Sequence, residues 1–289
     1  MSKSYVSVLR QLKEWGQSVR FGFYNDRRVV SQQDDAALQA PQHALTACKF
    51  RTSVHIVMIK LVVFDLDGTL LDTIQDLANA CNYALTQCSY PTHDVQAYKK
   101  FVGRGIFNLF RAALGSEASE ENVARMHSFF VPYYNQHKED NTRPYPGIEA
   151  LLGELEERGV ALAVASNKYQ EGTEKLVAKY FPERHFCAVL GQREGHPIKP
   201  DPAIVREAEQ AYMQWRPGIA GDVAVSQLSS DEVLYVGDSN VDMQTGHNAE
   251  VLTAAVLWGF RDEAELAAGK PDLMASNPSD ILNYVLSRR

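Results

Sequence analysis

The sequence has few cysteines, and they are scattered. Its 289 residues include four, Cys48, Cys81, Cys88 and Cys187, and none of these stands in a CxxC motif. A disulfide-stapled domain or a cysteine-rich zinc site needs more cysteines, or more closely spaced ones, so we expect neither. The pattern favours a reducing compartment, and we predict a cytoplasmic location.

Long apolar runs and an excess of positive charge are also absent. No stretch approaches the ~20 consecutive apolar residues that a transmembrane helix needs, so we expect no membrane partner. The formal net charge is −7, which argues against a nucleic-acid backbone as the main partner. A chain of 289 residues is long enough to bury the core of one large domain and one smaller domain.

The first 57 residues lack a clear apolar face. They carry eight basic and four acidic residues, a net charge of +4, and no continuous apolar core of a secretory signal. We predict a poorly ordered N-terminal extension over residues 1–57. Met58 stands just before the first predicted strand, so the extension is interpreted either as an added arm or as sequence upstream of a true start at Met58.

The most informative stretch is VVFDLDGTLLDT at residues 62–73. Branched and aromatic residues at 61–64 predict a strand buried on both faces, because such a strand is apolar throughout. Asp65 and Asp67 follow at alternate positions, so in an extended chain both point to one face. Adjacent carboxylates are costly to desolvate unless a cation or protons neutralise them. The pair therefore indicates a metal site. A DxD motif without the rest of this stretch would more often be a solvated acidic turn at the end of a strand.

The rest of the chain divides into a helical part and a part in which strands and helices alternate. Residues 73–143 show helical spacing without a convincing strand, and RPYPG at residues 143–147 restricts and turns the backbone. Further strands are predicted at 160–165, 188–190, 233–236, 252–257 and 272–274. Alternating strands and helices predict a parallel sheet covered on both faces. We expect an α/β protein with a Rossmann-like, doubly wound parallel sheet (58–72 and 144–289) and a small all-helical cap domain (73–143).

Polar residues follow two further predicted strands, and one lysine precedes a helix. They are Ser166, Asn167, Lys199, Asp238 and Asp242. Alone, a serine after a strand is usually a helix cap and a lone lysine is usually solvated. Because parallel strands place their carboxyl ends at one edge of the sheet, these side chains can converge with Asp65 and Asp67. Their order along the chain therefore predicts a single site.

These motifs together resemble those of the haloacid dehalogenase-like (HAD) phosphohydrolases. The matches are DLDGT at 65–69, the Ser166–Asn167 pair, Lys199 of KPDP, and GDSNVD at 237–242. Three further segments, FVGRGI (101–106), RPYPG (143–147) and TAAVLWGF (253–260), are most similar to the phosphoglycolate phosphatase-like branch. The resemblance covers residues 58–289 and implies the HAD core with a helical cap inserted after the first strand.

The resemblance implies chemical roles for the two aspartates of the first motif. Asp65 resembles the nucleophile that forms an aspartyl-phosphate, with a role as metal ligand alone as the alternative. Asp67 resembles the general acid/base. Thr69 is expected to fix the Asp67 side chain through a hydrogen bond.

Binding and metal-ligating roles follow from the same resemblance. Substrate or phosphate binding is expected for Ser166, Asn167, Lys199, Thr69 and Arg104. Arg104 would reach the non-phosphate end of the substrate from the cap, with a surface arginine in a helix–helix turn as the alternative. The expected ligands of Mg²⁺ are Asp65, Asp67 (through its carbonyl), Asp238 and Asp242, the last directly, through water or through Lys199. Because all the donors are oxygens, the set argues against zinc.

The implied function is a Mg²⁺-dependent phosphatase that hydrolyses a small phosphomonoester such as 2-phosphoglycolate through an aspartyl-phosphate. Alternatives on the same core are a phosphosugar mutase, a pyrophosphatase or a nucleotidase, and a non-catalytic protein of this fold. The expected partner is a small phosphorylated metabolite. The expected assembly is a monomer or a homodimer.

Overall fold

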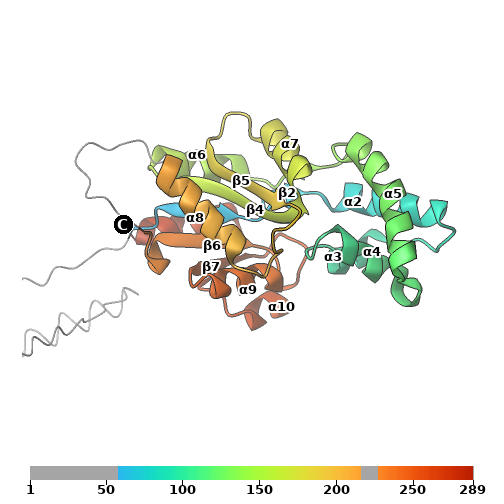
Figure 1. Cartoon of the computed structure of the whole chain (residues 1–289). Helices are drawn as coiled ribbons and strands as arrows, with labels where there is room; N and C mark the ends of the chain where they lie inside the picture. Colours follow the sequence, from blue (N-terminus) through green and yellow to red (C-terminus); the bar gives the residue numbers. More distant parts are fainter. Residues whose placement is uncertain (1–57, 216–226, 289) are drawn as a thin grey trace, which may run out of the picture. The chain divides into compact units, whose positions relative to one another are not determined.

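A six-stranded parallel sheet forms the centre of the protein (Figure 1). The computed structural model describes residues 58–215 and 227–288, so the predicted N-terminal extension lies outside the described range. The strand order is β5-β4-β1-β6-β7-β8, and every neighbouring pair is parallel. The strands are β1 (Leu61–Phe64), β4 (Ala161–Tyr169), β5 (Phe186–Gln192), β6 (Val233–Gly237), β7 (Leu252–Val256) and β8 (Leu273–Ala275). All six overlap predicted strands, although β4 and β5 run longer than predicted, and they confirm the α/β fold class.

Both faces of the sheet are covered by helices. On β1, Val62 and Phe64 belong to one hydrophobic cluster, whereas Leu61 and Val63 belong to another. The first cluster includes residues of α6 (Ile148–Glu157), α7 (Gln170–Tyr180) and α11 (Pro278–Ser287), and the second includes residues of α8 (Ala203–Trp215). Helices α9 (Asn240–Asn248) and α10 (Glu263–Ala268) pack through a further small cluster. A strand buried on two faces has no polar side to present, which explains its uniformly apolar sequence.

A helical cap is inserted between β1 and the rest of the core. Its helices are α2 (Ile74–Gln87), α3 (Val95–Phe101), α4 (Ile106–Leu114) and α5 (Glu120–His137), and the 3₁₀ turn η1 (Gly115–Glu117) joins the last two. Figure 1 shows them grouped beyond one end of the sheet, and they bury a hydrophobic cluster of their own. Two short antiparallel strands, β2 (Leu71–Asp72) and β3 (Arg143–Pro144), form the two connections. We therefore propose the cap boundaries at residues 73 and 143.

One helix differs from its predicted form. The sequence predicts separate helical stretches at 120–130 and 131–138, whereas α5 runs without interruption through Pro132. Proline weakens a helix because it lacks an N–H and its ring crowds the preceding turn. Phe130 and Tyr134, on either side of Pro132, are both 1% exposed in the cap cluster. Their burial supplies packing that holds the helix together across the proline.

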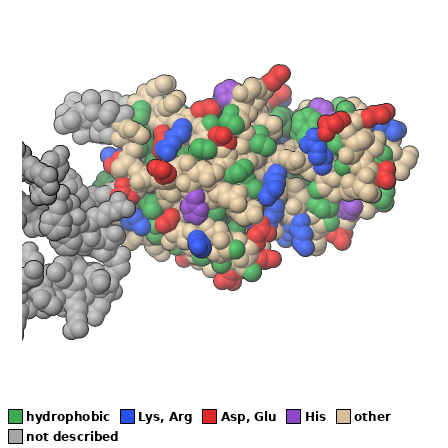
Figure 2. Space-filling view, turned by 60° about the horizontal axis from the view of Figure 1, so that its bottom comes forward, with side chains coloured by type: hydrophobic (Ala, Val, Ile, Leu, Met, Phe, Trp, Pro, Cys, Tyr) green, Lys and Arg blue, Asp and Glu red, His purple; other side chains and the backbone are tan. Residues whose placement is uncertain are grey.

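The outer surface carries charges of both signs. On the face drawn in Figure 2, acidic and basic side chains are interspersed with apolar ones. No helix among the described residues is long and apolar enough to cross a membrane. An anionic substrate would therefore be held by local cations rather than by the field of this face.

The side chain of Asp76 connects the two ends of the cap through hydrogen bonds. Its carboxylate is buried and accepts hydrogen bonds of 2.8–3.0 Å from the backbone N–H and side-chain amide of Asn141 and from the backbone N–H and hydroxyl of Thr142. Asp76 lies in the first turn of α2, while Asn141 and Thr142 directly precede β3. The entry and exit of the cap are thus joined by one side chain, beside the β2–β3 pair.

We expect Asp76→Ala to lower the free energy of unfolding by about 3 kcal/mol, roughly 6–12 °C in Tm, because several buried donors lose their acceptor. The matched control is Asp94→Ala. Asp94 is an exposed N-cap of α3 that accepts from Ala97 N–H at 2.8 Å, and caps of this kind contribute about 1 kcal/mol. Thermal denaturation followed by circular dichroism measures both. Equal, small losses of Tm in the two variants would contradict the role of Asp76 in connecting the two ends of the cap.

Candidate active site

The candidate site lies where the order of the sheet changes direction. From the neighbouring strands β1 and β6, the chain builds outward through β4 and β5 on one side and through β7 and β8 on the other. Ligands of open α/β sheets bind at such a switch point, outside the carboxyl ends of the strands. Asp65 directly follows β1 and Asp238 directly follows β6. Ser166 and Asn167 lie in the irregular end of β4, whose pairing with β5 shifts between Ala165 and Tyr169.

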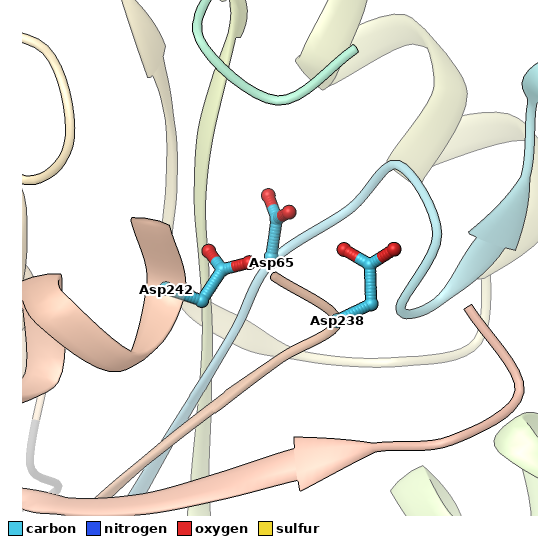
Figure 3. Close-up of side chains that lie close together, drawn as sticks. All are labelled: Asp65, Asp238 and Asp242. Carbon is cyan, nitrogen blue, oxygen red and sulfur yellow. The ribbon is translucent and has the colours of Figure 1, made fainter. Parts of the chain in front are cut away.

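Three carboxylates from different elements meet at this edge. Asp65, Asp238 and Asp242 each place one oxygen within 4.8 Å of the other two, and all three are buried. Figure 3 shows the three side chains close together, with Asp242 on helix α9 and the other two at strand ends. Asp67, the fourth predicted metal residue, was expected to contribute its backbone carbonyl, and its carboxylate lies outside this cluster. It forms an ion pair with Lys168 instead, at 3.0 Å.

Lys199 is the cation inside the cluster. Its ammonium lies 2.8 Å from an oxygen of Asp65 and 2.8 Å from an oxygen of Asp242, and it donates to Ala165 O at 3.1 Å. The side chain is 1% exposed. Burial lowers the pKa of Lys199, but Asp242 and Asp65 outweigh this effect and raise it well above its ordinary value. Lys199 therefore stays charged.

The cluster carries more negative charge than Lys199 can neutralise. Burial raises the pKa of Asp65 to about 7, although Lys199 opposes this effect. Burial, together with Asp242 and Asp65, also raises the pKa of Asp238 well above its ordinary value. When all three carboxylates are ionised, they and the one ammonium leave an excess of two negative charges. One divalent cation would offset that excess.

Two glycines allow the surrounding loops to approach Asp238. Gly68 has φ +88°, and a Cβ at this position would lie 2.2 Å from a carboxylate oxygen of Asp238. A Cβ on Gly259 would lie 2.3 Å from the Cβ of Asp238. The next residue, Phe260, donates its backbone N–H to Asp238 at 2.7 Å. The DLDGT turn and the segment after β7 thus close around one carboxylate.

Ser166 and Asn167 contribute in different ways. Ser166 is buried and lines the cavity described below. The side-chain oxygen of Asn167 accepts from Lys199 N–H at 2.8 Å, and its amide donates to Lys199 O at 3.2 Å and to Gly103 O at 3.0 Å. Asn167 therefore positions Lys199 and the cap loop, although the sequence predicted it to bind phosphate.

Two predicted contacts are not made. Thr69 Oγ1 is buried without a hydrogen-bond partner, and both carboxylate oxygens of Asp67 accept from Lys168 instead, each at 3.0 Å. The side chain of Arg104 is exposed and does not line the cavity, whereas its neighbours Gly103 and Gly105 do. The alternative interpretation, a surface arginine in a helix–helix turn, fits this arrangement.

Lys168 is the site residue that the sequence interpretation missed. Its side chain is 4% exposed, pairs with Asp67, and lies 4.9 Å from the ring centre of Tyr134 in the cap. A signal was available, because Lys168 directly follows Ser166 and Asn167 at the end of a predicted parallel strand. A lysine at that place belongs to the same sheet edge.

The core and the cap together line a partly open cavity of about 60 Å³. The core lines it with Asp65, Asp67, Ser166, Asn167, Lys168, Tyr169 and Lys199, and the cap with Leu77, Val102, Gly103, Gly105, Ile106, Leu109, Phe130 and Tyr134. Arg261, which follows β7, donates to Val102 O at 2.7 Å and also to Lys99 O, so the core holds the end of α3. A closed cap excludes water from the groups beneath it.

The chain is similar to known proteins over this whole region. The family model for haloacid dehalogenase-like hydrolases matches residues 62–256. Phosphoglycolate phosphatases of Vibrio parahaemolyticus and Mesorhizobium japonicum are 28% and 31% identical, over 78% and 70% of this chain and 96% and 84% of theirs. The crystal structure of a predicted phosphoglycolate phosphatase from Haemophilus somnus superposes with a TM-score of 0.68 at 27% identity, covering 78% of this chain and 97% of that one. The chain therefore belongs to the haloacid dehalogenase-like hydrolase family.

Proposed function

We propose that the protein is a Mg²⁺-dependent phosphatase that hydrolyses a small phosphomonoester, with 2-phosphoglycolate as the first candidate. The observation that carries the proposal is the buried group of Asp65, Asp238, Asp242 and Lys199, of which Asp65 and Lys199 line a cavity between the core and the cap. Asp67 lines the same cavity, next to Lys168. The similarity to curated phosphoglycolate phosphatases supports the choice of substrate.

The donor set fits Mg²⁺. The cluster offers carboxylate oxygens and excess negative charge, which suit a hard divalent cation. Both oxygens of Asp242 are already used, one by Lys199 and the other by the N–H and hydroxyl of Ser239. We therefore assign direct binding to Asp65 and Asp238, and an indirect role, through Lys199, to Asp242. When bound, the metal supplies Lewis-acid polarisation of the phosphoryl group.

Metal binding should depend on pH. Asp65 has a raised pKa of about 7, so the metal-free folded protein binds a proton that the unfolded chain releases, and stability falls as the pH rises from about 4 to 7. Mg²⁺ competes with that proton, so we expect it to raise Tm more at about pH 8 than at about pH 5.5. Melting curves with Mg²⁺ and with a chelator at both pH values measure the difference. The control is Asp238→Asn, in which the effect of Mg²⁺ should largely vanish; a Tm shift independent of pH would contradict this assignment.

The remaining residues have separate tasks in the reaction. A carboxylate oxygen of Asp65 attacks phosphorus, an oxygen–phosphorus bond forms, and the ester oxygen leaves with a proton from Asp67. Water then attacks the aspartyl-phosphate while Asp67 takes a proton from it, which frees phosphate and restores Asp65. Lys199, 2.8 Å from Asp65, offsets charge on the phosphoryl oxygens in both steps.

The lining of the cavity bears on the alternatives. A phosphosugar mutase, a nucleotidase or a pyrophosphatase would use the same core chemistry. The cap lines the cavity mainly with apolar side chains, which offer few hydrogen-bond partners to the hydroxyls of a sugar or a nucleoside and so favour a smaller leaving group. The cytoplasmic location and the assembly as monomer or homodimer stay predictions.

A phosphate-release screen tests the proposal. The substrates are 2-phosphoglycolate, sugar phosphates, nucleotides and pyrophosphate, each with Mg²⁺ and with a chelator. We expect release to be fastest from 2-phosphoglycolate and to disappear without the metal. An intramolecular phosphate shift without free phosphate would favour a mutase, and no release from any substrate would refute the proposal.

A further inference from the structure

Two polar residues that line the cavity have no task in the chemistry proposed above. They are Tyr134, on α5 of the cap, and Lys168, at the end of β4. They are neighbours, since the Lys168 ammonium lies 4.9 Å from the centre of the Tyr134 ring. The other cap side chains that line the cavity are apolar: Leu77, Val102, Ile106, Leu109 and Phe130.

The hydroxyl of Tyr134 has no hydrogen-bond partner. It is buried, and the whole residue is 1% exposed. An unpaired buried hydroxyl is costly, so native proteins rarely retain one without a ligand or a water to satisfy it. Stacking on Phe130, with ring centres 5.1 Å apart, contributes to holding the Tyr134 ring in place. Tyr134 lines the cavity, so its unpaired hydroxyl points to a hydrogen-bonding group on the ligand.

Lys168 differs from Lys199, the other lysine in the lining. Lys199 is committed to Asp65, Asp242 and the carbonyl of Ala165. Lys168 makes hydrogen bonds to the two carboxylate oxygens of Asp67, whereas an ammonium has three donors. Lys168 can therefore donate to a ligand while it still contacts Asp67.

We propose that Lys168 and Tyr134 bind a carboxylate on the leaving group, so that the site selects phosphomonoesters of short hydroxy acids. This inference rests on the proposed function and adds the means of substrate selection. In 2-phosphoglycolate a single methylene separates the ester oxygen from the carboxylate. The ester oxygen must lie beside Asp67, which protonates it, and this places the carboxylate beside the ammonium that already contacts Asp67. Arg104, the cation expected for this task, is exposed instead.

The test compares two substrates with two-carbon leaving groups, 2-phosphoglycolate and ethyl phosphate, of which only the first carries a carboxylate. The readout is the ratio of their kcat/KM values with Mg²⁺ present. We expect Tyr134→Phe to lower this ratio about tenfold, as for one lost hydrogen bond to a charged group. Lys168→Met should lower it by about 10²–10³-fold, as for one lost buried charge pair. The control is Lys175→Met, an exposed lysine paired with Glu171 on α7, which should leave the ratio unchanged.

The ratio of the two kcat/KM values distinguishes a loss of carboxylate recognition from a general loss of activity. Lys168→Met also removes the partner of Asp67, but that loss slows both substrates and cancels in the ratio. Tyr134→Phe removes a hydroxyl without a protein partner, so its Tm should not fall. A second readout is competitive inhibition of ethyl phosphate hydrolysis by glycolate, which Lys168→Met should abolish.

Two results would overturn the inference. If both variants slow the two substrates by equal factors while phosphate is still released, Lys168 and Tyr134 do not recognise the carboxylate, and the proposed function stands without them. If the wild-type protein releases phosphate from neither substrate, the proposed function fails and takes this inference with it.

Discussion

Asp65→Asn should abolish phosphate release, lowering kcat by about 10⁴-fold or more, as the loss of a nucleophile does in other enzymes. An asparagine keeps the shape of the side chain but cannot attack phosphorus. The substitution also removes one of the two carboxylates that are assigned to bind the metal directly. Steady-state phosphate release with 2-phosphoglycolate and Mg²⁺ measures the effect.

The fold of this variant should persist, because the substitution removes one charge from a buried cluster with excess negative charge. Its Tm without metal should therefore equal or exceed that of the wild type. The matched control is Asp201→Asn, an exposed aspartate near Lys199 whose side chain accepts from the Ala203 N–H at 2.9 Å. The control should keep full activity. Full turnover by Asp65→Asn would contradict the assignment of Asp65 as nucleophile.

Lys199→Met should both inactivate the protein and lower the free energy of unfolding by about 3–5 kcal/mol. The Lys199 side chain is 1% exposed and its ammonium contacts Asp65 and Asp242, each at 2.8 Å, so its removal leaves two buried carboxylates without their cation. These carboxylates must then take up protons, or the folded state loses stability. The loss should therefore grow as the pH rises, and Mg²⁺ should recover part of it.

Urea denaturation at two pH values measures this loss. The control is Lys60→Met, since Lys60 pairs with Glu232 at a site where its side chain is 30% exposed. Ion pairs of this kind contribute about 1 kcal/mol or less. A loss in Lys199→Met no larger than that in Lys60→Met would show that Lys199 is not essential to the cluster.

Much of the fold follows from local patterns in the sequence. The apolar run at residues 61–64 predicts β1 because burial on two faces leaves no place for polar side chains, and the same holds for β6. Features that depend on distant contacts were not predicted. The passage of α5 through Pro132 depends on the packing of the cap. The hydrogen bonds of Asp76 connect it to Asn141 and Thr142, which lie 65 and 66 positions further along the chain, and no local spacing indicates such contacts.

The candidate site also has features that could be predicted from the sequence and features that could not. The polar residues at strand ends converge because a parallel sheet places them at one edge, so the meeting of Asp65, Lys199, Asp238 and Asp242 could be predicted. The direction in which a loop side chain points depends on its local turn and on the docking of the cap. For this reason the exposed Arg104, the unpaired Thr69 hydroxyl and the pairing of Lys168 with Asp67 could not be predicted.

The central claim is that phosphate passes through a covalent intermediate on Asp65. The most direct measurement traps the intermediate in the wild-type protein within a single turnover, because Asp67 acts in both steps and its substitution would also slow formation of the intermediate. The protein is mixed with 2-phosphoglycolate and Mg²⁺, quenched in acid within one turnover, digested and analysed by mass spectrometry. We predict one phosphoryl group on the peptide that contains Asp65. A phosphoryl group on another residue, or phosphate release with Asp65 never modified, would contradict the mechanism.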